Sequence, residues 1–189
     1  MMRKIGGGTE NIIKMLGIVE KPPGILLEYC SMGDLKNFIS LNKKHNKDQL
    51  SLYDCFTGII SGMEHIHLQI LAHCDLAARN VLLKEEGGKY ICKIADFGMS
   101  AVGSKRDTIV QIPVRWYSPE CLRYNSVGPP LDVWGFGCIL IEILNWGKTP
   151  FEKLSTTQEV ITLFMNLIKM TPEEKKIKIV ESNSFKYFG

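Results

Sequence analysis

The stretch LAHCDLAARNVLL, Leu71 to Leu83, sets polar side chains at a spacing that decides how the rest of the chain is interpreted. Asp75 and Asn80 lie five positions apart in it, and we expect both on one loop ahead of a short strand. A further acidic residue, Asp96, stands in ADFGMS just after the strand-like stretch YICKIA. These three residues are therefore the first candidates for a functional site.

The length and composition indicate a globular domain. A chain of 189 residues can form one hydrophobic core, and contents of 45% hydrophobic and 23% charged residues are ordinary for such a domain. The net charge of +3 is small and dispersed, so no nucleic-acid partner is expected. The basic run NKKHNK, 42–47, is more typical of a solvated loop than of a binding patch.

The six cysteines and the apolar runs indicate the cellular setting. No two cysteines have the C-x-x-C spacing of a zinc site, which favours free thiols in a reducing cytoplasm. The opening MMRKIGGGTE lacks the apolar core of a secretion signal, and no apolar run approaches the about 18 residues that cross a membrane. We therefore expect a cytoplasmic location and no membrane segment in these residues.

Hydrophobic spacing and turn residues predict the secondary structure in outline. The helix over 130–147 is apolar nearly all round, so we expect it inside the domain. The end of the chain, 171–189, is weakly patterned, and we expect it to fray. The other expected elements are two strands within 11–30 around Pro22-Pro23-Gly24, helices over 32–41, 51–70 (capped by Ser51 and Asp54) and 156–170, strands over 80–84 and 90–95, and a polar loop over 98–112.

The residue types at the candidate site are those that phosphoryl transfer from ATP requires. A carboxylate must orient the attacking hydroxyl and accept its proton, a role that suits Asp75. Metal ions that bridge the phosphates need oxygen ligands, which the amide of Asn80 and the carboxylate of Asp96 can supply. The tripeptide DFG is weak by itself, but its position about fifteen residues after the Asp75–Asn80 pair makes the combination specific.

The order of four motifs resembles the large lobe of a protein kinase, and specifically that of a protein tyrosine kinase. The motifs are HCDLAARN, DFG, PVRWYSPE and DVWGFG. Serine/threonine kinases typically have a lysine where Ala77 stands, whereas Arg79 two residues later is similar to the tyrosine-kinase pattern. PVRW, Pro113 to Trp116, resembles the platform that supports the long tyrosine ring, so that its hydroxyl reaches Asp75.

The resemblance implies an α+β, kinase-like fold with a mainly helical large lobe and a remnant of the small-lobe β-sheet. It implies transfer of the γ-phosphoryl group of ATP to a protein tyrosine, with Mg²⁺ or Mn²⁺. The parent protein would be cytosolic or a receptor whose cytoplasmic part includes this chain. The alternative is an inactive pseudokinase or truncated fragment that acts as a protein-binding module.

Roles for individual residues follow from the same resemblance. The catalytic group would be Asp75 as base with Arg79 and Asn80, and the metal ligands would be Asn80 and Asp96. The remaining assignments are Leu27 as gatekeeper, the C=O of Glu28 and N–H of Cys30 as adenine partners, Leu82 as the floor of the adenine site, Pro113 and Trp116 as substrate platform, His73 and Phe97 in an internal hydrophobic spine, Asp132 as acceptor for catalytic-loop N–H groups, and Glu120 as partner of a late arginine.

The resemblance divides the chain into three parts and leaves some family features unmatched. We expect 1–30 to be the small-lobe remnant and hinge, 31–152 the large lobe with its catalytic and activation loops, and 153–189 a divergent C-terminal tail. No residues match the Gly-rich loop or the strand lysine, which hold the nucleotide in line, so little activity is expected of this chain alone, as for a partial gene product. No arginine follows Arg123, so Glu120 is not expected to form its family pairing.

Cys74 stands where the family typically has an arginine. That arginine binds a phosphate on the activation loop and links phosphorylation to activity. A cysteine cannot do so, and the stretch from Gly98 to Arg115 contains no tyrosine. We therefore interpret Cys74 as a buried thiol that marks the loss of a phosphorylation switch, with the catalytic residues Asp75 and Asn80 retained.

Overall fold

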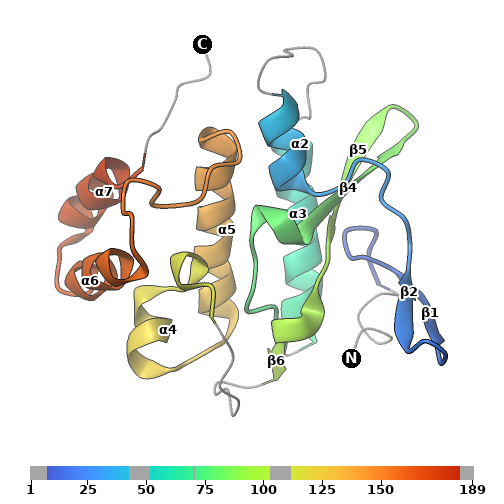
Figure 1. Cartoon of the computed structure of the whole chain (residues 1–189), viewed down its shortest axis with the longest axis horizontal. Coiled ribbons are helices and arrows are strands. Elements are labelled where there is room, and N and C mark those ends of the chain that lie inside the picture. The colour runs from blue at the N-terminus through green and yellow to red at the C-terminus, as the bar shows by residue number, and fades with distance from the viewer. Residues whose placement is uncertain (1–7, 43–51, 70, 103–111, 184–189) are drawn as a thin grey trace.

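The structure, a computed structural model, describes residues 8–42, 52–69, 71–102 and 112–183 (Figure 1). It is an α+β fold, as predicted. The described part contains three two-stranded antiparallel sheets, β1–β2, β3–β6 and β4–β5. The strands are β1 Met15–Val19, β2 Gly24–Leu27, β3 Leu71–Ala72, β4 Val81–Glu86, β5 Lys89–Ile94 and β6 Ala101–Val102; the helices are α2 Leu35–Asn42, α3 Leu52–Leu68, α4 Pro119–Tyr124, α5 Pro129–Leu144, α6 Thr157–Leu167 and α7 Pro172–Glu181.

The β4–β5 hairpin forms where alternating residues flank two glycines. Gly87 and Gly88 have φ values of 59° and 77°, which glycine adopts without steric cost, and they join strands in register from Glu86–Lys89 to Val81–Ile94. Ile12 forms a parallel bridge with Ile94, because Ile94 N–H donates to Asn11 O and Ile13 N–H to Ile94 O. The segment around Ile12 thereby extends the hairpin on its β5 side by one isolated bridge.

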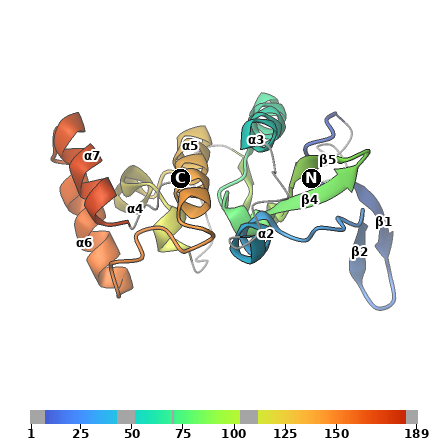
Figure 2. The same ribbon diagram turned by 90° about the horizontal axis from the view of Figure 1, so that it is seen from above.

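The β1–β2 hairpin confirms the two expected strands, but it lies apart from the main core at one end of the molecule (Figures 1 and 2). Its apolar side chains are exposed on both strands, including Leu16 at 56%, Ile18 at 61% and Ile25 at 59%. Strands of this composition normally bury at least one face. The hairpin is therefore held by its own ladder and not by the hydrophobic core.

α3 packs against β5 through its glycines. A Cβ atom on Gly62 would lie 2.8 Å from Asn11 O and 2.8 Å from Ile94 Cδ1, so only glycine permits this close approach. The buried residues Ile59 and Ile66 of α3 meet Ile94 in the main hydrophobic cluster. The expected helix over 51–70 is thus confirmed for Leu52–Leu68, while Ser51, its expected cap, lies outside the described residues.

α5 lies between the α2–α3 side of the molecule and the α4–α6 side in both views (Figures 1 and 2). Ile139 and Ile143 are buried, as its apolar composition predicts. The expectation that it is enclosed all round is wrong for Val133, which is 68% exposed. This residue borders two apolar cavities of about 830 and 480 Å³, which its described neighbours leave unfilled.

The end of the chain is more regular than its sequence pattern predicts. The expectation of fraying is wrong for α7, which begins with a capping box between Thr171 and Glu174. After the helix, the Asn183 side chain accepts a hydrogen bond from Phe151 N–H at 2.6 Å and donates to Ile179 O. These contacts fasten residues 172–183 to the segment that follows α5.

Two features near the site have no counterpart among the predicted elements. α4 begins where Ser118 Oγ accepts from Cys121 N–H, with Pro119 at the first helical position. The start of the expected polar loop, 98–112, instead includes a 3-10 turn at Phe97–Met99 and β6, which pairs with β3. Both features are too short to show an apolar period, and residues 103–111 lie outside the described residues.

The close approach of α3 to the strand segment generates a stability prediction. We expect Gly62→Ala to lower the free energy of unfolding by about 1–3 kcal/mol, because the added methyl group overlaps a backbone oxygen. Gly137→Ala is the matched control: it has no atom within 4 Å of its Cβ position and should be neutral or slightly stabilising. Urea denaturation measures both, and equal effects of the two substitutions would contradict the packing described.

Candidate active site

The loop before Asp75 is held by one buried carboxylate from α5. Asp132, 2% exposed, accepts the N–H of His73 at Oδ2, 2.9 Å, and the N–H of Cys74 at Oδ1, 2.8 Å. The His67 ring nitrogen Nε2 lies 2.9 Å from Oδ2 and supplies a third contact. Both carboxylate oxygens are therefore satisfied inside the protein, and the loop backbone is fixed to the first turn of α5.

Cys74 occupies the sharpest point of this loop. Its φ of 65° lies in the left-handed region, which costs a non-glycine residue about 1–2 kcal/mol. The side chain is 1% exposed, its thiol lies 3.6 Å from Ala72 O, and it packs with Tyr117 and Leu131 in a second apolar cluster. The interpretation of Cys74 as a buried thiol is confirmed by this environment.

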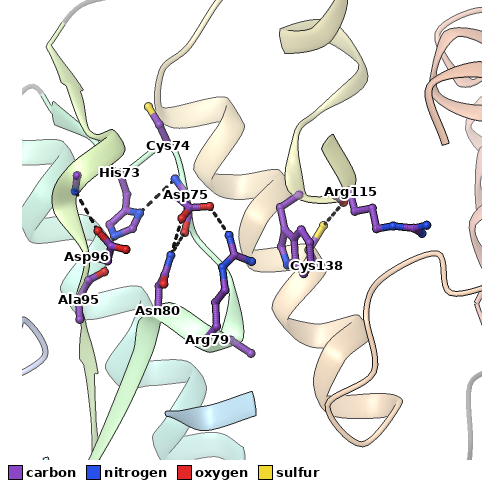
Figure 3. Close-up of polar contacts among 12 residues, drawn as sticks. His73, Cys74, Asp75, Arg79, Asn80, Ala95, Asp96, Arg115 and Cys138 are labelled. Carbon is purple, nitrogen blue, oxygen red and sulfur yellow. Dashed lines mark hydrogen bonds and ion pairs between the residues drawn. The ribbon is translucent and has the colours of Figure 1, made fainter. Parts of the chain in front are cut away.

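Asp75 is oriented by the two polar residues that follow it in the motif (Figure 3). Asn80 Nδ2 donates to Asp75 Oδ2 at 2.8 Å and to the Asp75 backbone O at 2.7 Å. Arg79 forms an ion pair with the other carboxylate oxygen, Oδ1. The 3-10 turn at Ala78–Asn80 brings both side chains back to Asp75, which is 8% exposed. The carboxylate thus has one defined direction.

His73 joins the loop to the end of β5. Its Nδ1 accepts the N–H of Asp75 at 3.3 Å, so the ring proton resides on Nε2, which donates to Ala95 O at 2.9 Å. The ring also packs against Phe97 with centroids 5.2 Å apart. His73 is completely buried, and it therefore connects the backbone of Asp75 with the residue before Asp96.

Asp96 ends β5 beside Asn80. Ala95 N–H donates to Asn80 O at 2.8 Å, and the Asp96 carboxylate accepts Gly98 N–H at 3.2 Å from a backbone with φ 61° (Figure 3). Asp96 is exposed, and the amide nitrogen of Asn80 is already engaged, so the Oδ1 of Asn80 is left for a cation. One amide and one carboxylate oxygen fit Mg²⁺, which keeps waters and substrate oxygens as its other ligands.

Within the described residues, His, Cys, Asp and Glu side chains form no cluster of three or more that could hold a metal ion by themselves. The oxygens of Asn80 and Asp96 by themselves would need further ligands, such as those of a bound nucleotide, to hold Mg²⁺.

The residues expected around adenine lie along the connection from β2 to α2 and on β4. Leu27 is 37% exposed, Cys30 is 7% exposed, and burial raises the pKa of its thiol. The Glu28 side chain accepts from Lys14 N–H and pairs with Lys93. Within the described residues, no hydrogen bond occupies the C=O of Glu28 or the N–H of Cys30, the two groups expected to meet adenine.

Leu82 is brought near this connection by backbone pairing. Met32 N–H donates to Leu83 O and Leu83 N–H to Gly33 O, and Asp34 forms an antiparallel bridge with Leu82. The half-buried Leu82 therefore lies on the strand directly beside the connecting segment.

The platform residues meet the catalytic loop through Arg79. Pro113 caps the 3-10 turn Val114–Trp116, and the Arg79 guanidinium lies 4.5 Å from the centre of the Trp116 ring. This is a cation–π distance. Arg79 thus contacts the Asp75 carboxylate on one side and the platform on the other.

Glu142 on α5 is a site residue that the sequence analysis missed. Its Oε2 accepts Ala78 N–H at 2.9 Å and Trp116 Nε1–H at 3.1 Å, so it joins the catalytic loop to the platform. Burial raises the pKa of Glu142 above its usual value of 4.5, although both donors oppose the shift. The signal was available: a single carboxylate inside the apolar run CILIEIL needs buried partners.

Arg115 and Glu120 have structural positions rather than catalytic ones. Arg115 donates to the carbonyl oxygens of Pro150, Phe151 and Leu154, which fastens the platform to the segment after α5. Glu120 is exposed, and no ion pair within the described part of the chain involves it.

Substitution of Glu142 separates its hydrogen bonds from its charge. Glu142→Ala leaves Ala78 N–H and Trp116 Nε1–H without an acceptor, and we expect it to cost about 2–5 kcal/mol of stability. The single carbonyl oxygen of Glu142→Gln can accept both donors, so its loss should be smaller. Urea unfolding of the three proteins at pH 7 provides the comparison.

The pH dependence of the unfolding free energy tests separately whether the pKa of Glu142 is raised. Because the folded pKa is raised, the folded chain retains a proton that the unfolded chain releases above pH 4.5. The wild-type chain should therefore lose stability as the pH rises from 4.5 through the raised pKa of folded Glu142, and Glu142→Gln should lack this contribution. Identical pH profiles of stability for the wild type and the glutamine variant would count against a raised pKa of Glu142.

Comparisons with known proteins agree with the geometry of the site. A family model described as protein tyrosine and serine/threonine kinase matches residues 1–182, a range that extends past the quoted motifs through α6 and α7. The megakaryocyte-associated tyrosine-protein kinase of Mus musculus is 32% identical over 146 residues, covering 77% of this chain and 28% of that protein. Ephrin type-A receptor 3 of Danio rerio is 34% identical over 161 residues, covering 80% and 16%.

A third relative shows how small a part of such proteins the chain represents. Tyrosine-protein kinase Abl of Drosophila melanogaster is 32% identical over 154 residues, which cover 78% of this chain and 9% of that protein. Across these three relatives the chain spans 9% to 28% of their length. No helix in the described residues is long and apolar enough to cross a membrane. The chain belongs to the protein tyrosine and serine/threonine kinase family.

Proposed function

We propose that the chain carries the catalytic-loop half of a protein tyrosine kinase centre, which transfers the γ-phosphoryl group of ATP to a tyrosine hydroxyl. The observation that supports it most is the position of Arg79, which contacts both the Asp75 carboxylate and the Trp116 ring. Such a contact supports the proposal because it would hold Asp75 and Trp116 at a fixed distance from each other. A tyrosine ring supported by Pro113 and Trp116 would present its hydroxyl to Asp75.

In this proposal the side chains divide the work of the reaction. Asp75 accepts the proton of the tyrosine hydroxyl at the carboxylate oriented by Asn80, and the ion pair with Arg79 directs that carboxylate. Asn80 and Asp96 would hold Mg²⁺, which when bound neutralises charge on the phosphate oxygens. The Glu28 C=O and Cys30 N–H would bind the adenine edge between Leu27 and Leu82.

The proposed division of the chain follows from these roles. Residues 1–30 are assigned to the small-lobe remnant and hinge, 31–152 to the large lobe and 153–189 to its C-terminal extension. We assign the chain to the cytoplasm or to the cytoplasmic part of a receptor, with a tyrosine-containing protein as its substrate. The six free cysteines support a reducing setting.

One observation favours the second candidate, a protein-binding module without activity of its own. The β1–β2 hairpin exposes Leu16, Ile18, Ile25 and Leu26, each by more than half of its surface. Exposed apolar strands with free edges are suited to pairing with another polypeptide. Nucleotide binding distinguishes the two candidates, because only the kinase centre requires it.

Thermal unfolding with and without nucleotide tests the proposal. Magnesium and ATP together should raise the Tm, since ligand at a hundredfold excess over its Kd adds about 2.7 kcal/mol of stability. Asp96→Asn should lose the magnesium-dependent part of the shift, because the carboxylate ligand is gone. Glu85→Gln removes an exposed carboxylate of the β4–β5 hairpin and should behave as wild type.

Two results would speak against the kinase centre and for the binding module. One is the absence of any shift at millimolar ATP. The other is a shift that is equal with and without magnesium and unchanged in Asp96→Asn.

A further inference from the structure

Two buried thiols, neither of which belongs to the candidate active site, lie close together. Cys92 Sγ on β5 is 3.1 Å from Cys55 Sγ on α3, and the two residues are 37 positions apart in sequence. Cys55 is 0% exposed and Cys92 is 1% exposed. All six cysteines of the chain are free thiols, and a described contact brings the sulfur atoms of Cys55 and Cys92 together.

The backbone around the pair is close and rigid. A Cβ atom on Gly58 would lie 3.5 Å from Cys92 Cβ, which shows how tightly α3 passes over β5 at this level. The Asn11 side chain donates to Cys92 O at 3.0 Å and lies close to Gly58 of α3, so it fastens the strand at the same level. A disulfide has a bond length of about 2.0 Å, so the sulfur atoms need to approach by only about 1 Å.

A cavity has one of the two cysteines in its wall. It has a volume of about 350 Å³ and opens beside α3 and β5. Cys92 forms part of its wall, together with Asp54, Thr57 and Tyr90, whereas Cys55 does not line it. The cavity is large enough for a small oxidant such as hydrogen peroxide, and of the two cysteines only Cys92 borders it, which makes Cys92 the first candidate for oxidation.

We propose that Cys55 and Cys92 form a peroxide-sensitive modification site that closes to an intramolecular disulfide. In the first step the Cys92 sulfur attacks one oxygen of hydrogen peroxide, the O–O bond breaks, and Cys92 sulfenic acid and water form. In the second step the Cys55 sulfur attacks the Cys92 sulfur and displaces the hydroxyl group, which leaves as water with the Cys55 proton. Two thiols are oxidised and one peroxide is reduced to two waters.

The environment of Cys55 fits the resolving role. Its hydrogen bond with Cys92 and its burial both raise the pKa of the Cys55 thiol, so it remains protonated at neutral pH. A protonated thiol is a poor nucleophile toward peroxide, so Cys55 is not the first target; it attacks the neighbouring sulfenic acid as its proton passes to the departing hydroxyl group, which leaves as water. The reduced pair is thereby stable in a reducing cytoplasm and responds when peroxide accumulates.

The bond would connect two elements that lead to the catalytic residues. In the chain, α3 precedes β3 and the loop with His73 and Asp75, and β5 ends two residues before Asp96. A disulfide between them removes freedom from the unfolded chain and holds these two elements together. Oxidation should therefore stabilise the fold, and it does not depend on the proposed kinase activity.

The test uses the reduced 189-residue chain treated with a small excess of hydrogen peroxide at neutral pH. We expect the intact mass to fall by about 2 Da, as two hydrogen atoms are lost. Peptide mapping after alkylation should show Cys55 linked to Cys92 and the other four cysteines alkylated. The Tm should rise by roughly 5–15 °C and return to its original value on addition of dithiothreitol.

Two variants distinguish this pair from general thiol oxidation. Cys121→Ser removes a buried cysteine of another cluster and should still form the bond. Cys55→Ser should not form it, and its Cys92 should proceed to sulfenic or sulfinic acid instead. Peptide mapping of the wild-type chain tests the proposal even if Cys55→Ser fails to fold. Disulfides between other cysteines, or alkylation of both Cys55 and Cys92 after peroxide treatment, would overturn the proposal.

Discussion

The carboxylate of Asp132 is the constraint on which the candidate site depends. It accepts two consecutive backbone N–H groups, those of His73 and Cys74, from a position that is almost fully buried. These bonds offset the cost of the left-handed backbone at Cys74 and set the direction in which the chain enters Asp75. The side chain at position 74 has no part in this contact, which is why a cysteine there leaves the catalytic loop in order.

A second carboxylate of α5 secures the other end of the same loop. Glu142 accepts Ala78 N–H ten residues after Asp132, a rise of about 15 Å along the helix. Asp75 lies between these two anchors, so its position is limited by a single rigid element. Because Glu142 also binds Trp116, α5 links Trp116 to the loop of Asp75, and Arg79 contacts both of these residues.

Sequence patterns predicted those elements whose formation depends mainly on residues close together in the chain. The Gly87-Gly88 turn, the apolar spacing of α3 and the Asp75–Asn80 spacing each carry their own signal, and the family resemblance ordered them. Glu142 was missed because its partners come from segments 26 and 64 residues away. The α7 helix was missed because its stability comes from a capping box and from Asn183, not from an apolar period. The exposure of Val133 depends on which neighbours cover α5, a property that the sequence of α5 does not contain.

Amide hydrogen exchange in Asp132→Asn tests most directly whether this carboxylate holds the catalytic loop. In Asp132 the two N–H groups meet different oxygens, His73 N–H at Oδ2 and Cys74 N–H at Oδ1, whereas asparagine has an oxygen at only one of these two positions and an NH₂ donor at the other. We predict that at least one of these amides exchanges about tenfold faster or more, as expected for the loss of one buried hydrogen bond. The amide of Ile66 in α3 should keep its rate. Unchanged exchange at both His73 and Cys74 would contradict the central role of Asp132.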